Sequence, residues 1–151
     1  MPISANHVPS QGGFTLFELM IAIAVIAILT AIGVPAYQGY VQKAAMTDML
    51  QTMVPYKTSI EICALQQGHL ADCDSGNNGI PLTKTTYYVA AISVSAGVIT
   101  LVGQGALTGL TTTLKPTINT VHGHLDWQKN CITTPINTSL NDACNAVFRF
   151  E

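Results

Sequence analysis

The chain has 151 residues, of which only 9% are charged, and its formal net charge is -2 at pH 7. Once a membrane segment is set aside, this length allows one small hydrophobic core and excludes a second domain of similar size. The six basic residues lie scattered and form no stripe that could neutralise a phosphate backbone, so the composition argues against nucleic-acid binding.

The first element predicted along the chain is a membrane-spanning helix. The 21 residues from Phe14 to Val34 carry one charge, Glu18, and at 1.5 Å per residue they match the roughly 30 Å of a hydrocarbon core. A secretory signal peptide has a shorter apolar region that follows basic residues, whereas the first 13 residues here contain no Lys or Arg. We therefore expect a span over residues 14–35 after a leader of residues 1–13.

The orientation of this span depends on two opposing signals. Positive-inside bias does not favour a cytoplasmic N-terminus, because the leader is uncharged and Lys43 follows the span. The four cysteines beyond the span indicate disulfides and an oxidising compartment. We give the cysteines more weight and expect a single-pass inner-membrane protein with a cytoplasmic N-terminus.

An amphipathic pattern then continues over residues 36–67. Apolar residues recur there at steps of three and four, which predicts that one long helix of roughly 80 Å leaves the membrane. These residues are Tyr37, Tyr40, Val41, Ala44, Met49, Met53, Tyr56, Ile60 and Cys63. Pro35, close to Gly33, and Pro55 each remove a backbone donor, so we expect bends or local unwinding at these places.

Residues 68–151 change to short β-like runs and are expected to form a disulfide-bonded head. The runs "TTYYVAAISVS", "GVITLVG" and "GLTTTLKP" are rich in Tyr, Val, Ile and Thr and are separated by glycine-containing steps. They predict an antiparallel meander of three or more strands that packs against the helix. The last stretch, "SLNDACNAVFRFE", is predicted to be a short helix or an irregular segment.

The cysteines contain no CxxC motif, so zinc binding is not indicated. Four cysteines allow three connectivities. Our hypothesis is the local pairing, Cys63–Cys73 and Cys131–Cys144, in which each bond closes a loop of moderate length.

The stretch "GGFTLFELMIAIAVIAILTAIGVPAY" resembles the N-terminal signature of type IV pilins and related pseudopilins. The resemblance implies that a membrane aspartyl protease cuts after Gly13, N-methylates Phe14 and leaves Glu18 as the family's glutamate. It also implies an α+β type IV pilin fold, with a long N-terminal helix packed on an antiparallel sheet. The segment "KAAMTDMLQTMVPYK", the two cysteine pairs and the ending "VFRF" most resemble major pilins of enterobacteria, although family leaders usually carry basic residues.

The function implied is structural, with no catalytic residues, cofactor or metal. The subunits would leave the inner membrane and stack into an extracellular filament for adhesion, motility or DNA uptake, with helix unwinding between about Ala27 and Pro35. Partners implied by the resemblance are other copies of the chain, the prepilin peptidase, an assembly ATPase with its platform protein, minor pilins and an outer-membrane secretin. We expect Glu18 to pair with the new α-amine of Phe14 during assembly.

Three alternatives stand beside this interpretation. A major pseudopilin of type II secretion shares the N-terminal signature, but its family uses calcium in the C-terminal loop, where Asp126 and Asp142 are too few here. The loop at Asp72 and Asp74 also lacks the ligands of an EF-hand. A signal-anchored periplasmic protein would leave Glu18 without a partner, which is costly in a membrane. An enzyme could use His122, His124 and Asp126 as zinc ligands on one strand face, but a further strong ligand is missing.

Overall fold

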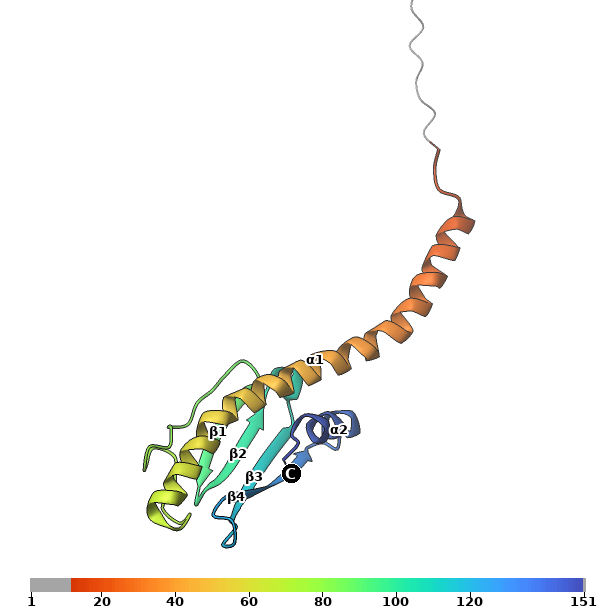
Figure 1. Ribbon diagram of the computed structural model, residues 1–151. Helices are drawn as coiled ribbons and strands as arrows, with labels where there is room; N and C mark the ends of the chain where they lie inside the picture. The colour runs from red at the N-terminus through yellow and green to blue at the C-terminus, as the bar shows by residue number, and fades with distance from the viewer. Residues whose placement is uncertain (1–11, 151) are drawn as a thin grey trace, which may run out of the picture. The chain divides into compact units, whose positions relative to one another are not determined.

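The computed structural model describes residues 12–150 and divides the chain into two compact units, which meet between Ala36 and Tyr37. The expected leader lies outside the described residues except for Gly12 and Gly13. One long helix, α1 (Leu16–Gln67), contributes to both units (Figure 1). Each unit is described by itself below.

The first unit consists of the apolar part of α1 and the residues before it. All of its described residues, 12–36, are exposed, so it has no core of its own. Helical hydrogen bonding satisfies the backbone, which is what a segment surrounded by lipid requires. The unit therefore presents an apolar surface that nothing in the described chain covers.

α1 continues through Gly33, Pro35 and Pro55 without ending. The local unwinding expected at these residues is thus not seen in the single chain, while the expected bends stay a prediction. Unwinding of the helix in an assembled filament stays a prediction. A filament map with continuous helix between Ala27 and Pro35 would contradict it.

Packing explains why Pro55 does not interrupt the helix. Its neighbours Met53 and Tyr56 are 1% and 2% exposed and belong to the core of the second unit. Burying such a side chain contributes about 1.5–3 kcal/mol, and the two together exceed the roughly 3 kcal/mol that a proline costs inside a helix.

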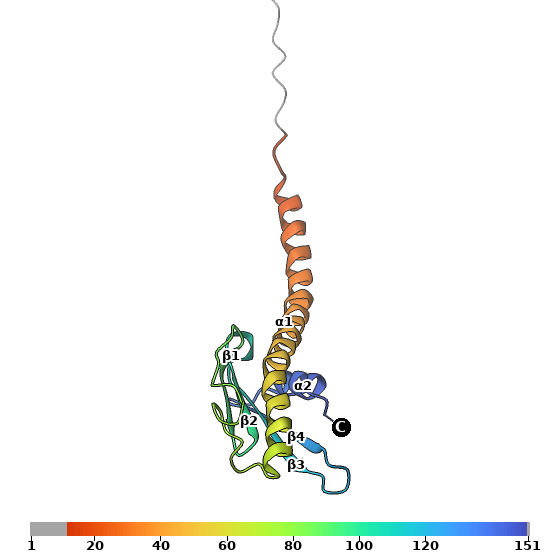
Figure 2. The same ribbon diagram turned by 60° about the vertical axis from the view of Figure 1, so that its left-hand side comes forward.

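The second unit, the head, is a four-stranded antiparallel sheet with α1 across one face (Figure 2). The strand order is that of a simple meander, and the elements are β1 (Val89–Ser95), β2 (Val98–Gly103), the short helix η1 (Gly105–Leu107), β3 (Leu110–Ile118), β4 (Leu125–Thr133) and α2 (Thr138–Val147). The expected fold class is confirmed. The first three strands match the three β-like runs, and the last stretch contains helix α2.

The core of the head lies between α1 and the sheet. From α1 it takes Met46, Met49, Met53, Tyr56 and Ile60, and from the sheet Ile92, Ile99, Leu101, Leu110 and Leu114. Alternate residues of each strand point inward, as the period of a strand requires. Ile99 pairs with Leu114 across β2 and β3, so two buried residues stand side by side on the inner face.

The far end of α1 is closed by a glycine and a disulfide. Gly68 has φ +73°, a conformation that other residues rarely adopt, and its N–H donates to the carbonyl oxygen of Ala64 at 2.9 Å. Cys63, on the last turns, is bonded to Cys73 in the following loop. This end of the helix is therefore held to the head by a covalent bond.

Tyr56 connects α1 to the loop before β1, and removing its hydroxyl is expected to make the head less stable. Its hydroxyl donates to the carbonyl oxygen of Leu82 at 2.6 Å, and burial raises the pKa of Tyr56 above its ordinary value. Tyr56→Phe should lower the free energy of unfolding by about 1 kcal/mol at neutral pH, because the carbonyl loses its partner. Urea unfolding of the full chain in detergent measures this loss.

The raised pKa also predicts how the wild type responds to alkali. The stabilisation is complete below the pKa of about 10 of an unfolded tyrosine and is lost as the pH rises through the higher folded value. Tyr56→Phe should lack this part of the alkaline loss, whereas Tyr87→Phe, at a side chain 79% exposed, should keep it. Identical alkaline profiles for wild type and Tyr56→Phe would contradict the prediction.

Candidate functional site

Glu18 and Thr15 form a reciprocal cap at the start of α1. The backbone N–H of Thr15 donates to Glu18 Oε2 at 3.0 Å, and the Thr15 hydroxyl donates to the same oxygen at 2.9 Å. The Glu18 N–H in turn lies 3.2 Å from Thr15 Oγ1. In the uncleaved chain the carboxylate is thus partly satisfied from its own helix. The Thr-x-x-Glu spacing is the sequence signature of such a capping box, and Thr15 was missed in our sequence analysis.

The expected cleavage position is open and sterically undemanding. Gly13 and Phe14 are exposed, and Phe14 has 90% of its surface accessible. A Cβ atom added at Gly12 or at Gly13 would meet nothing within 4 Å. The fold therefore gives no reason for glycine at either position, so any requirement for Gly13 must come from a processing enzyme.

The apolar part of α1 could cross a membrane by length and composition. Its best 18-residue window has a mean hydropathy of 2.6, and none of that window is buried. Of the helices within residues 12–150, no other passes this test. Glu18 is the only charged residue between Phe14 and Val34, so the carboxylate stands alone in an exposed apolar surface.

Within the head, α1 has an outer face that carries no charge from Ala44 to Leu65, after the exposed Lys43. This outer face consists of Ala44, Thr47, Gln51, Val54, Thr58, Ile62 and Leu65, all exposed. Leu65 is 76% and Val54 51% exposed, which is unusual for a face turned permanently to water. Tyr37, Tyr40 and Ala44, assigned from the sequence to the same stripe as the core residues, are exposed instead, because steps of three and four place them on the outer face with Thr47, opposite the side that carries Met49 and Met53.

The charges near the far end of α1 are turned to the sheet. Lys57 Nζ lies 2.6 Å from Glu61 Oε1 and 5.2 Å from the centre of the Trp127 ring. Trp127 Nε1 donates to the same Glu61 oxygen at 3.2 Å. These contacts connect α1 to β4 and leave the outer face uncharged.

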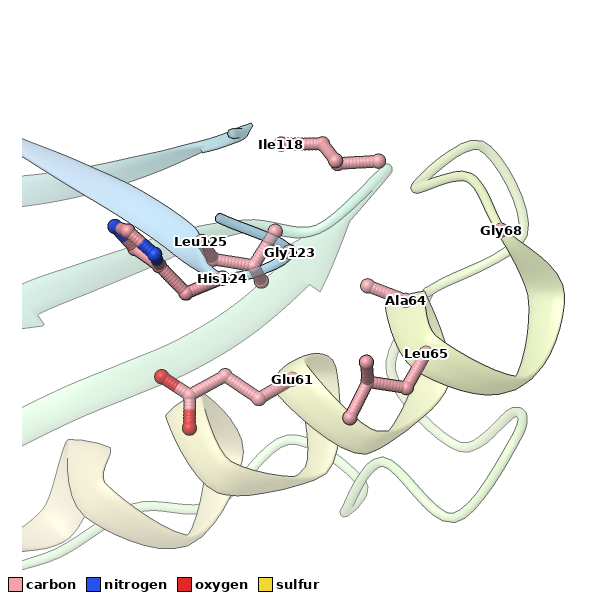
Figure 3. Close-up of a pocket in the computed structure, with 8 residues that line it drawn as sticks. All are labelled: Glu61, Ala64, Leu65, Gly68, Ile118, Gly123, His124 and Leu125. Carbon is pink, nitrogen blue, oxygen red and sulfur yellow. The ribbon is translucent and has the colours of Figure 1, made fainter. Parts of the chain in front are cut away.

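A cavity of about 460 Å³ lies between the end of α1 and the β3–β4 hairpin (Figure 3). It is lined by Glu61, Ala64, Leu65, Gly68, Ile118, Gly123, His124 and Leu125. His124 and Glu61 are the ionisable side chains in this lining, while most of the remaining surface is apolar. His124 Nε2 pairs with Asp126 Oδ1 at 2.9 Å, and Asn119 Nδ2 donates to the other Asp126 oxygen at 3.0 Å.

The candidate metal ligands do not form a metal site. The rings of His122 and His124 stack with centroids 5.8 Å apart, and across residues 12–150 no group of three or more such side chains is placed to hold a metal. The zinc arrangement considered for these histidines with Asp126 is therefore absent from the described chain. Asp74, in the loop tested for calcium, accepts the Ala96 N–H at 2.8 Å and so connects this loop to the turn between β1 and β2.

The second disulfide joins Cys131 of β4 to Cys144 of α2, and with Cys63–Cys73 it gives the pairing expected from the sequence. We expect a non-reduced digest to show these two bonds by mass spectrometry. A crossed pairing such as Cys63–Cys144 would contradict the prediction.

Replacing Cys131 and Cys144 by Ser should lower the free energy of unfolding by about 2–4 kcal/mol, because the unfolded chain regains the conformational freedom that the closed loop removes.

Comparison with known proteins identifies the family. Residues 9–34 match the model of the prokaryotic N-terminal methylation motif. The chain is 52% identical over 141 residues to prepilin peptidase-dependent protein D of Escherichia coli K12, covering 93% of this chain and 96% of the relative. The solution NMR structure of the major type IV pilin PpdD from enterohemorrhagic Escherichia coli matches with a TM-score of 0.64 and 49% identity, over 74% of this chain and 84% of that chain.

The chain belongs to the type IV pilin family. A further relative of this pilin is the fimbrial protein EcpC of Eikenella corrodens, 38% identical over 78% of this chain and 81% of the relative. The type IV pilus subunit protein TapA of Aeromonas hydrophila is 41% identical over 47% of this pilin and 50% of the relative. The names of these relatives describe structural subunits, and the methylation motif with its apolar helix is consistent with membrane anchoring and filament assembly.

Proposed function

We propose that this pilin is the major structural subunit of a type IV pilus. The observation that carries the proposal is Glu18, a single carboxylate at the start of an exposed apolar helix and directly after the Gly13–Phe14 junction. Such a helix is stable in a bilayer before assembly and against other copies of itself afterwards. An anchor alone would have no use for the carboxylate, whose burial in a membrane costs about 2.5–3.5 kcal/mol.

Cleavage supplies the partner of Glu18. Prepilin peptidase cuts after Gly13 and methylates the nitrogen of Phe14, which changes from a neutral amide to an amine. With an ordinary pKa of about 7.7–8.0, this amine is largely protonated at neutral pH. Phe14 lies two residues before the start of α1 and four residues before Glu18, so a subunit displaced along the filament can set its amine against the Glu18 of a neighbour.

The charge pair fixes the stagger between subunits. Moving an apolar helix from lipid to a packed bundle gains little hydrophobic energy, since lipid tails are as apolar as the side chains. Two buried charges, by contrast, are tolerated only where they meet. The Thr15 hydrogen bonds hold the carboxylate until then and lower the cost of an unpaired Glu18 in the membrane.

The outer face of α1 extends the contact into the head. Its uncharged surface from Ala44 to Leu65 can pack against the helices of neighbouring subunits without leaving charges unpaired. The filament core then consists of helices over residues 14–67, and the heads form the outer layer.

A second candidate function is that of a major pseudopilin in type II secretion, which would use the same N-terminal chemistry. The Cys131–Cys144 bond favours the pilus, because it fastens α2 to β4 covalently, whereas the resembling pseudopilins pin their C-terminal loop with calcium. In either case the partners are the prepilin peptidase, an assembly ATPase with its inner-membrane platform protein, minor subunits and an outer-membrane secretin.

Electron microscopy of sheared surface filaments tests the proposal. Cells that produce this chain at its normal level should carry filaments built from it, and cells without the pilus ATPase should carry none. Filaments that depend on the type II secretion ATPase instead would assign the chain to the pseudopilins. Absence of the chain from all surface filaments would overturn the pilus function.

A further inference from the structure

The most exposed large apolar side chain in the described part of the head is Ile136, at 91%. It lies in the loop between β4 and α2, directly before Asn137, whose side chain accepts the Leu140 N–H at 3.0 Å and begins α2. Covering such a side chain with an apolar partner or with lipid is favourable, because it removes apolar surface from water.

The loop that carries Ile136 lies at the end of the head where α1 enters. Ser139, three residues further on, has its hydroxyl 3.3 Å from Gln42 Oε1. Thr138 and Ser139 also line a groove together with Gly39 and Lys43 of α1. The start of α2 is therefore level with the first two turns of α1 in the head.

These turns have the composition of a membrane interface. Tyr37 and Tyr40 are 70% and 74% exposed, and Lys43, three residues further along the same side, is exposed as well. Aromatic residues followed by a cation are typical of the boundary between hydrocarbon and water. Because the apolar span ends just before Tyr37, this stretch enters the headgroup layer as soon as the chain leaves the hydrocarbon.

The distances are compatible with contact between the head and the lipid. From Tyr37 to Gln42 the helix rises about 7.5 Å, and one headgroup layer is roughly 5–7 Å thick. If the helix leaves the bilayer along its normal, a loop level with Gln42 reaches the outer edge of that layer.

We propose that, before assembly, the head rests on the membrane surface and inserts Ile136 into the headgroup layer beside Tyr37 and Tyr40. The partner is the phospholipid surface itself, continuous with the lipid around the span. The proposal rests on the membrane-anchored precursor of the proposed function. Extraction into a filament must then detach the head from lipid as well as the span.

Photo-crosslinking to phospholipid tests this contact. The photoreactive residue p-benzoylphenylalanine is placed, one site at a time, at Ile136, at Val121 and at Ile28 of the full-length chain, in cells that lack the assembly ATPase and contain ³²P-labelled phospholipid. Val121 is the matched control, since it is 82% exposed but lies on the β3–β4 hairpin, which borders the far end of α1. Ile28, 63% exposed within the span, reports on anchoring alone. All three side chains are exposed, so the head should fold in each variant.

The expected result is a lipid adduct at Ile28 and at Ile136, with the yield at Ile136 about fivefold above that at Val121. Equal yields at Ile136 and Val121, with a strong adduct at Ile28, would overturn the docking of the head but leave the anchor intact. A protein adduct with a second copy at Ile136, without lipid, would equally overturn it. Loss of the adduct at Ile28 would instead contradict the anchored precursor of the proposed function.

Discussion

Glu18→Ala is expected to insert into the membrane, to be cut after Gly13 and to fold a head with both disulfides, yet to give few or no filaments. The substitution leaves the new amine of Phe14 buried without a partner in the assembling filament. Removing one member of a buried charge pair typically costs about 3–5 kcal/mol, which corresponds to roughly 10²–10⁴-fold weaker addition of a subunit. Counting filaments by electron microscopy, with the cleaved subunit quantified in membranes, measures the effect.

Two control variants isolate the charge. Thr30→Ala removes another polar group from the same span, one whose hydroxyl donates only to its own helix at Ile26 O, 2.9 Å away, and it should assemble normally. Glu18→Gln keeps the shape and the Thr15 contacts but not the charge, and it should fail like Glu18→Ala. Normal numbers of filaments from either Glu18 variant would refute the assembly role.

Gly13→Ala is expected to block processing and leave the entire pool of the chain in the inner membrane at precursor mass. The structure gives no steric reason for this loss, because an added Cβ meets nothing within 4 Å. The defect should therefore arise in the peptidase, and the head should remain as stable as in the wild type. Mass spectrometry of the membrane fraction distinguishes the precursor from the mature chain, which begins with methylated Phe14.

Gly12→Ala is the matched control for this experiment. It makes the same change one residue earlier, in equally open surroundings, and should be cut between Gly13 and Phe14 as usual. If Gly13→Ala were cut as efficiently as Gly12→Ala, the cleavage position proposed here would be wrong.

The long helix and most of the sheet could be predicted from the sequence because their periodicity is strong. The expected end at Gln67 coincides with the end of α1, where Gly68 supplies the left-handed residue that a helix terminus favours. β4 was not located in advance. In its sequence LDWQKNCIT, Lys129 occupies an inward position between Trp127 and Cys131, so the apolar alternation of a half-buried strand is interrupted.

The errors on α1 have two sources. Tyr37 and Tyr40 were assigned to the stripe of the core residues, but steps of three and four from Tyr40 lead to Ala44 and Thr47 on the outer face, so both tyrosines are exposed. Local unwinding was expected at Pro55, yet buried neighbours on both sides hold the helix in place there. Sequence spacing shows which residues share a face, whereas the effect of a proline also depends on how its neighbours are packed.

At the candidate site, the sequence indicated Glu18 because an isolated carboxylate in an apolar run is conspicuous. Thr15 was missed, because the membrane segment was judged by its length and hydropathy, and its Thr-x-x-Glu pattern was not considered as a helix cap. The capping box changes the view of the precursor, in which the carboxylate already has hydrogen-bond partners before cleavage. Assembly then requires Glu18 to gain a cation while it can retain the Thr15 contacts.

A high-resolution cryo-electron microscopy map of the filament tests the central claim most directly. The account predicts that the methylated amine of Phe14 in one subunit lies within ion-pair distance, about 4 Å, of the Glu18 carboxylate in a neighbouring subunit. It also predicts that this contact repeats at every subunit along the core. A map in which Glu18 contacts only Thr15 of its own chain, with the Phe14 amine elsewhere, would contradict it.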